Sequence, residues 1–478
     1  MAYTEFYIRS GGSALNAGST NTDAAFASYT NGSWDNTTKV FTVASGNPSS
    51  DGVTVGMFAS VHTNAATFTG YIARITAVTS TTITVSTTAD GGSAVSTGAL
   101  TRNLRVGGAW APPTGAIDVP YNIVDLNTTN TSGDTPRVNI AAGTYSITAV
   151  IARSLDGPTI FEPYSVTPGD GLGRVHYQGP ATGSSFQMFA ITGEDSTFLR
   201  HDVSQNGNAG TANVGFSVQA ANNILINCRA FSVRTTGFQI TSAADHCTFY
   251  ECEAYDCNQS NTANHGGFTT AAIEGHFVRC ISHDNATANA MGFHITDGSS
   301  FIQCIADSNG SHGFNIDCAS TMLMNCDSYN NGGDGIIMEF TVPTSVVIES
   351  CNLVANGGWG ININTAASDL RNGIISNCGF GSGTMANGDG EIGNDTTSTF
   401  NHLLIRGSIT YSANTTPWAD PDDGDFSITS SEAKNIQQSF LQLQSGYGSP
   451  NPTVSYTDIG AGQSECTGGG GSEHSFAY

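Results

Sequence analysis

Residues 292–309 read GFHITDGSSFIQCIADSN, and residues 313–331 repeat the phrase as GFNIDCASTMLMNCDSYNN. Each phrase contains a Gly with an apolar residue after it, an alternating strand, a loop, a second strand that ends in Cys, and a polar turn. The chain returns to this pattern between residues 215 and 378, with a period of about 25 residues. Such a period is typical of a solenoid, in which every repeat forms one coil of a stack.

Two columns of residues mark the repeat. The glycines, each followed by Phe or Ile, are Gly215, Gly237, Gly267, Gly292, Gly313, Gly335 and Gly360. The cysteines are Cys228, Cys252, Cys280, Cys304, Cys326, Cys351 and Cys378, at successive separations of 24, 28, 24, 22, 25 and 27 residues. Because side chains alternate along a strand, the polar residue before each Cys should point outward and the thiol inward. The sequence therefore predicts a column of thiols in the core.

Asparagines and phenylalanines extend the register. An Asn stands five residues after four of the cysteines, at Asn285, Asn309, Asn331 and Asn356. Asn tolerates the left-handed conformation of a tight bend, and its amide can bond to the coils above and below, so we expect an Asn ladder in the turns. The residues after four of the glycines, Phe238, Phe268, Phe293 and Phe314, are predicted to stack in the core rather than to form a sugar platform.

These columns predict an all-β protein built on a right-handed, single-stranded parallel β-helix over residues 120–410. Residues 1–100 contain short Val/Ile/Thr strands separated by turn clusters, which favours a small antiparallel β-barrel or sandwich that anchors or caps the β-helix. Residues 101–119 connect the two. Residues 411–478 are predicted to form a C-terminal cap with one short helix, at 431–444, and an extended Gly-rich tail.

The charge balance restricts the partners. Fifteen basic and thirty-nine acidic residues give a net charge of −24, which repels phosphate backbones and anionic lipid, so neither nucleic acid nor membrane is an expected partner. No basic segment followed by an apolar one opens the chain, so no signal peptide is recognised. We therefore expect synthesis in a reducing compartment, with the cysteines packed as thiols and Cys466 as the exposed one.

Over residues 120–410 the coil phrases resemble the pectate-lyase-like right-handed β-helix superfamily, which includes polysaccharide lyases, pectin hydrolases and many phage tailspikes. The flanking phrases VGGAWAPP at 106–113 and YTDIGAGQ at 456–463 resemble segments of uncharacterised phage-type β-helix virion proteins. The resemblance implies the fold and leaves the function open among several classes.

Enzymes of this superfamily work on the outer face of one sheet, where carboxylates bind Ca²⁺ or act as an acid/base pair. The candidate residues for such a site here are Asp297, Asp317, Asp334, Glu339 and His294. Two carboxylates on adjacent coils would lie about 5 Å apart, which fits a retaining glycosidase pair or a shared cation. The simpler interpretation is a set of strand-end acids on an acidic protein. The superfamily's catalytic motifs are absent, so no catalytic residue, metal ligand or cofactor is assigned, and Ca²⁺ is left open.

Three functions fit these features. The favoured one is a non-enzymatic structural or host-attachment protein of a virus particle, such as a tail fibre, tailspike or capsid appendage, made in the host cytoplasm. Its expected partners are other virion proteins, host surface glycans and further copies of itself; the resemblance to tailspikes implies an oligomer, for which a trimer is our guess. The second is a polysaccharide lyase or glycoside hydrolase, which a cleft with three acids and an Arg would favour. The third is a bacterial surface adhesin.

Overall fold

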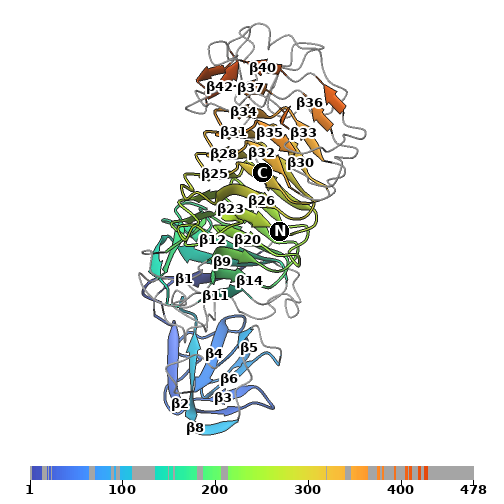
Figure 1. Ribbon diagram of the computed structural model, residues 1–478. Coiled ribbons are helices and arrows are strands. Elements are labelled where there is room, and N and C mark those ends of the chain that lie inside the picture. Colours follow the sequence, from blue (N-terminus) through green and yellow to red (C-terminus); the bar gives the residue numbers. More distant parts are fainter. Residues whose placement is uncertain are drawn as a thin grey trace, which may run out of the picture. The chain divides into compact units, whose positions relative to one another are not determined.

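The computed structural model describes residues 3–12, 19, 21–22, 24–63, 70–87, 91–92, 97–109, 135–148, 150–153, 157–179, 187–205, 214–318, 320–339, 346–363, 374–376, 379–381, 392–393, 404–406, 409–411, 418–420 and 425–428. All regular elements in these residues are strands, and none is a helix (Figure 1). The chain divides into two compact units, Met1–Ser260 and Asn261–Tyr478.

In the first unit, three parallel sheets form a β-helix, and each coil contributes one strand to each sheet. The first sheet has the order β1 (Tyr3–Ile8), β9 (Thr135–Ala141), β12 (Thr159–Tyr164), β15 (Ser196–Leu199), β18 (Ile224–Ile226) and β21 (Thr248–Tyr250). The second has β10 (Gly143–Ser146), β13 (Val175–Gly179), β16 (His201–Gln205), β19 (Arg229–Phe231) and β22 (Glu253–Tyr255). The third has β11 (Ile151–Arg153), β14 (Gln187–Ile191), β17 (Val214–Val218) and β20 (Phe238–Ile240).

The second unit repeats this architecture. Its first sheet comprises β24 (Gly275–Val278), β27 (Ser299–Ile302), β30 (Met322–Met324), β33 (Val347–Glu349), β36 (Ile374–Ser376) and β39 (Leu404–Arg406). The second comprises β25 (Ile281–His283), β28 (Ile305–Asp307), β31 (Asp327–Tyr329), β34 (Asn352–Val354), β37 (Gly379–Gly381) and β40 (Ile409–Tyr411). The third comprises β23 (His265–Thr270), β26 (Ala290–Ile295), β29 (Phe314–Ile316), β32 (Ile336–Met338), β35 (Ile361–Ile363) and β38 (Ile392–Gly393).

A six-stranded antiparallel barrel lies in the first unit. Its strands are β2 (Ala27–Asp35), β3 (Val40–Thr42), β4 (Phe58–Thr63), β5 (Gly70–Val78), β6 (Thr82–Val85) and β8 (Gly98–Val106), and the β4–β5 pairing closes the ring. The short β7 (Gly91–Gly92) adds to β5. Alternating apolar residues from these strands, including the fully buried Trp34 and Phe41, give the barrel a hydrophobic core of its own. The predicted barrel or sandwich is therefore a barrel.

The N-terminal strand differs from the predicted division at residue 100. β1 precedes the barrel in the chain, yet it pairs in parallel with β9, from Tyr3 opposite Thr135 to Ile8 opposite Ile140. Its alternation buries Phe6 and Ile8 completely, as the core of a coil requires. The β-helix thus begins at β1, and the barrel is an insertion between the first two strands of its first sheet.

The thiol column lies inside the coils. Cys228, Cys252, Cys280, Cys304, Cys326 and Cys351 are at most 1% exposed, and none of the nine cysteines that the structure describes is in a disulfide. The residue before each of the six has a left-handed backbone, with φ between 52° and 55°. The chain therefore turns a corner there, between its first and second strands, and the corner rather than continued alternation places the polar side chain outside.

The Asn ladder forms between the second and third sheets of the second unit. The side-chain amide of Asn285 donates to Asn309 (2.7 Å), Asn309 donates to Asn331 (2.8 Å), and Asn331 donates to Asn356 (2.9 Å). The left-handed residue is not the ladder Asn, as predicted, but the one before it: Asp284, Ser308, Asn330 and Ala355 have φ between 52° and 55°. The positive φ turns the chain so that the following Asn points inward, where its burial is complete or nearly so.

Phenyl rings stack beside these ladders. Phe293 lies between Phe268 and Phe314, with ring centroids 4.9 Å and 4.7 Å away and nearly parallel planes. The glycine before each ring permits this spacing, because a Cβ on Gly292 would lie 2.5 Å from the carbonyl oxygen of Gly313. The recurrence of a Gly at this position of each coil thus reflects close contact between neighbouring coils.

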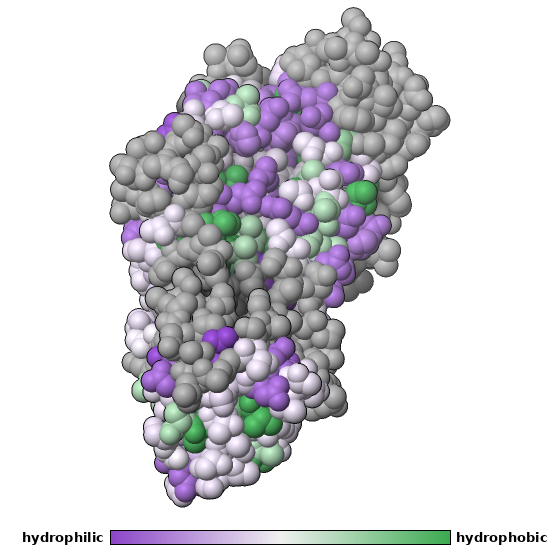
Figure 2. All heavy atoms as spheres, turned by 90° about the horizontal axis from the view of Figure 1, so that it is seen from below, coloured by the Kyte–Doolittle hydropathy of each residue, from purple (hydrophilic) through white to green (hydrophobic). Residues whose placement is uncertain are grey.

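Beyond the barrel and the coils, the structure describes little of the predicted C-terminal cap. β41 (Trp418–Asp420) and β42 (Asp425–Ile428) form an antiparallel pair. The helix predicted at 431–444, the thiols Cys378 and Cys466, and the Gly-rich tail lie outside the described residues. Among the coloured residues of the face in Figure 2, the hydrophobic ones form only small, separate areas. No helix in the described part of the chain is suited to crossing a membrane.

Candidate functional site

The structure brings three of the five predicted site residues together on the third sheet of the second unit. His294 lies on β26, Asp317 directly follows β29, and Glu339 directly follows β32. The Nε2 atom of His294 is 4.0 Å from a carboxylate oxygen of Asp317. Glu339 accepts a hydrogen bond of 2.7 Å from the side-chain amide of Asn315.

The strand pattern explains why these side chains share the outer face. Phe293 and Ile295 are buried on either side of His294, and Phe314 and Ile316 are buried on either side of Asn315. His294 pairs with Asn315 on one neighbouring strand and with Thr269 on the other. We call Thr269, His294 and Asn315 the third-sheet polar column; Asp317 and Glu339 flank it.

The column holds hydrogen-bonding atoms without protein partners. Although the side chains of His294 and Asn315 point away from the core, His294 is only 6% exposed and Asn315 is fully buried. Thr269 Oγ1, His294 Nδ1 and Asn315 Oδ1 are buried and have no hydrogen-bond partner among the described residues. Leaving such an atom unpaired costs roughly 1–3 kcal/mol, so three in one column mark a position where the protein is arranged to bind a polar ligand.

Burial and neighbouring charges set the protonation of the cluster. Burial lowers the pKa of His294, and the Asp317 carboxylate and the backbone of Asn264 oppose this only in part, so the imidazole is neutral at pH 7. Burial also raises the pKa of Asp317, which His294 counteracts and Glu339 reinforces. The pKa of the nearby His265 is lowered by burial and by His294. The site therefore presents neutral imidazole next to carboxylates.

The other two predicted residues have structural roles elsewhere. Asp297 accepts a hydrogen bond of 2.7 Å from the backbone N–H of Gly298, inside its own turn. Asp334 is buried, and its carboxylate accepts from the backbone N–H of Trp359 (2.6 Å) and the side chain of Asn362 (3.1 Å). Burial alone would raise the pKa of Asp334, but the adjacent His312 ring and the hydrogen bonds from Trp359 and Asn362 hold it below its usual value.

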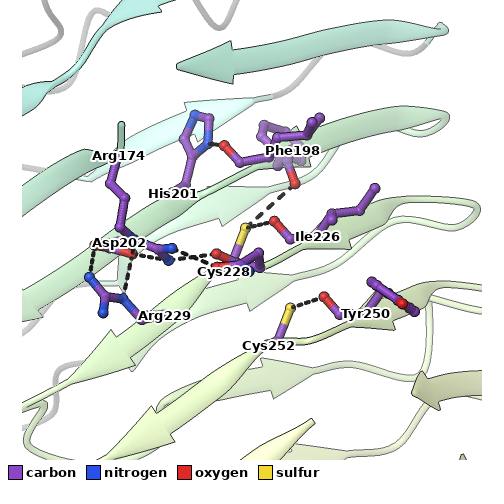
Figure 3. A network of polar contacts seen from close by, with 11 residues as sticks. Arg174, Phe198, His201, Asp202, Ile226, Cys228, Arg229, Tyr250 and Cys252 are labelled. Atoms are coloured by element: carbon purple, nitrogen blue, oxygen red, sulfur yellow. Dashed lines mark hydrogen bonds and ion pairs between the residues drawn. The ribbon is translucent and has the colours of Figure 1, made fainter. Parts of the chain in front are cut away.

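A charged cluster that was not predicted lies on the second sheet of the first unit (Figure 3). The buried Asp202, on β16, accepts from Arg174 Nη2 at 2.6 Å and from Arg229 Nη2 at 2.7 Å. Arg174 also donates to the side-chain oxygen and to the backbone carbonyl oxygen of Asn227. Asp202 accepts from both guanidinium groups, and Arg174 donates to Asp202 as well as to Asn227. The cluster therefore links neighbouring coils, and few of its polar atoms remain to bind a ligand.

The sequence contained signals for the missed residues. Asp202 and Arg229 are opposite each other in register, and their separation of 27 residues lies within the range of the coil lengths. Asn315 stands two residues before Asp317, on the same face of the strand. In the part of the chain that the structure describes, no group of three or more His, Cys, Asp or Glu side chains is arranged to hold a metal ion.

The fold is shared with several solved structures. The chain is similar to a pectate lyase, Pel9A, at 15% identity over 72% of this chain and 93% of that one, with a TM-score of 0.48. It is also similar to the ORF18 protein of Geobacillus virus E2 (13% identity, 59% and 55%, TM-score 0.37) and to the Dettilon tailspike protein (11% identity, 59% and 57%, TM-score 0.39). The likeness is one of fold alone.

No family model matches the sequence, and no curated protein matches it. The parallel β-helix implied by the resemblance to the pectate-lyase-like superfamily is the fold observed. Because a fold by itself does not determine a function, the function has to be argued from this chain's own residues.

Proposed function

We propose that the chain is a glycan-binding host-attachment protein of a virus particle. The observation that carries this proposal is the third-sheet polar column, where Thr269, His294 and Asn315 hold buried atoms without hydrogen-bond partners among the described residues. Such atoms, fixed on three successive strands, suit a ligand with several hydroxyl groups, because each hydroxyl can donate and accept.

The architecture supports the same role. Every coil is hydrogen-bonded through its backbone to its neighbours within each unit, which gives a rigid support for a surface site. The barrel has a separate core and is inserted near the start of the β-helix, so it can serve as an anchoring module without disturbing the coils. Attachment proteins need both an anchor and a rigid binding face.

The experiment has two measurements. Quantitative mass spectrometry of purified particles should find the chain in repeated copies, and the purified chain should bind host cells. Replacement of Asn315 by Leu should weaken cell binding, since it removes the unpartnered acceptor. Replacement of Gln239, at an outward position of the third sheet in the first unit, serves as the matched control. A chain absent from particles, or cell binding that Asn315→Leu leaves unchanged, would contradict the proposal.

A polysaccharide lyase or glycoside hydrolase is the second candidate. Asp317 and Glu339 directly follow the paired residues Ile316 and Met338, so they extend from adjacent coils, and the pKa of Asp317 is raised by burial. A raised pKa on one of two neighbouring carboxyl groups is a feature of acid/base hydrolysis of a glycosidic bond. Release of reducing ends from a bound glycan, abolished by Asp317→Asn, would favour this candidate over a purely attaching protein.

A further inference from the structure

The third-sheet polar column presents mainly hydrogen-bond acceptors. The amide of Asn315 donates to Glu339, which fixes its orientation and directs Oδ1, an acceptor only, away from that carboxylate. His294 Nδ1 has no hydrogen-bond partner among the described residues, whereas Nε2 faces the negatively charged carboxylate of Asp317 at 4.0 Å. The ring proton therefore resides on Nε2, beside Asp317, and Nδ1 accepts.

We propose that this column recognises the hydroxyl or amino donors of an uncharged or amino-bearing glycan and excludes glycans that carry carboxylate or sulfate groups. This inference rests on the glycan-binding role proposed above and names its ligand class. The ligand supplies donors to Asn315 Oδ1 and His294 Nδ1, and Thr269 Oγ1 can donate or accept.

The charges around the column determine what is excluded. Asp317 is partly exposed and Glu339 is exposed, so both carboxylates meet any ligand that contacts the column. The Lys and Arg residues in the described part of the second unit are Arg279 and Arg406, and neither belongs to the third sheet. An acidic sugar placed there would face like charges, and no Lys or Arg on the described strands of this sheet in the second unit would neutralise it, which is unfavourable for binding.

The strand spacing fixes how the ligand lies. Thr269, His294 and Asn315 belong to three successive hydrogen-bonded strands, and neighbouring strands are about 4.8 Å apart. Their unpartnered atoms therefore form a row across the strands, perpendicular to the strand direction. An extended glycan lying along this row would make one polar contact with each coil.

The test measures the affinity of the full-length chain for four immobilised polymers: dextran, chitosan, polygalacturonate and dextran sulfate. Thr269→Val removes the hydroxyl group of Thr269, and Asn315→Leu removes the side-chain amide of Asn315. Both substitutions change the shape of the side chain little. Thr248→Val, at an outward position of β21 in the first unit, is the matched control. Thermal unfolding of each variant shows that it has folded.

We expect binding to dextran or chitosan and a loss of affinity of about ten-fold or more in each column variant, while Thr248→Val binds as wild type. Comparison of the neutral dextran with the cationic chitosan distinguishes recognition of hydroxyl groups from recognition of amino groups. Equal or tighter binding to the acidic polymers, or column variants that bind like wild type, would overturn this inference and leave host attachment standing. Failure to bind any polymer, together with failure to bind host cells, would overturn both.

Discussion

A single residue with a positive φ makes the corner between the first and second strands of each coil. The left-handed conformation costs most residues roughly 1–2 kcal/mol, and Gly adopts it without this cost. Ser350 has φ 54° at such a corner and is buried. We expect Ser350→Gly to raise the free energy of unfolding by up to about 1 kcal/mol. The control is Ser300→Gly, within the extended strand β27, which should be destabilising; a lower denaturation midpoint for Ser350→Gly would contradict the argument.

A half-buried carboxyl predicts a pH dependence. Asp327, on β31, accepts a hydrogen bond of 2.8 Å from the side chain of Asn352, and burial raises the pKa of Asp327 to about 8. An unfolded Asp has a pKa of about 3.9, so between these values the native state holds a proton that the unfolded state has lost, and stability falls as pH rises. Asp327→Asn keeps the shape and removes this titration.

The measurement for Asp327 is the difference in unfolding midpoint between the variant and wild type across pH. At pH 4 the wild-type carboxyl is protonated in the native state, and the two proteins should be similar in stability. The advantage of Asp327→Asn should grow with pH and level off above about pH 8. A difference that does not change with pH would show that the Asp327 carboxyl is not perturbed.

The residue scale also shows what the sequence could predict about the site. His294 and Asp317 could be predicted because side chains alternate along a strand. The neighbours Phe293 and Ile295 of His294, and the neighbour Ile316 of Asp317, point into the core, so His294 and Asp317 must point outward. Asp297 and Asp334 lie in turns, where alternation no longer decides direction, and the structure gives them other partners. The left-handed corners were not predicted, because each is a turn of a single residue and several residue types occupy it. The sequence therefore carries no signal that distinguishes such a corner from a continuing strand.

Among the elements, the third-sheet strands come closest to each other at the Gly column. A Cβ on Gly313 would lie 2.0 Å from Ser328 Oγ and 2.7 Å from the carbonyl oxygen of Gly335, and the latter cannot move without displacing the next coil. We expect Gly313→Ala to destabilise the protein by about 1–3 kcal/mol. Gly179→Ala is the control, because there the closest atom is the flexible side-chain sulfur of Met188, at 3.1 Å. Equal effects on the unfolding midpoint would contradict this explanation.

The elements differ in how far local sequence determines them. The barrel was predicted from short Val/Ile/Thr strands within residues 1–100, and the coils were predicted from the repeat. The position of β1 could not be predicted in this way, because Tyr3–Ile8 pairs with residues more than one hundred positions later. Only the long-range pairing decides whether such a strand joins the barrel or the β-helix.

At the scale of the whole molecule, the barrel is an insertion whose two ends meet. Ala27 at its start pairs with Val106 at its end, and the backbone N–H of Phe26 donates to Val106 at 2.7 Å. Its core is separate from that of the coils, and a T-shaped contact of 5.2 Å between Phe6 and Phe58 links the two. Replacing residues 27–106 by a short Gly/Ser linker should therefore leave β1 paired with β9 and the coils folded.

This prediction is checked by far-ultraviolet circular dichroism, thermal unfolding and glycan binding of the excised chain. The Asn ladder and the third-sheet polar column belong to the second unit and share no residue with the barrel, so binding should persist. Exposure of Phe6 should lower the unfolding temperature modestly, and Phe6→Ser in the excised chain tests whether that surface limits solubility.

A chain lacking residues 1–9 is the comparison, because it removes β1 and uncovers the edge of β9. If excising the barrel unfolds the coils while removing β1 does not, then the barrel, and not β1, stabilises the first coil.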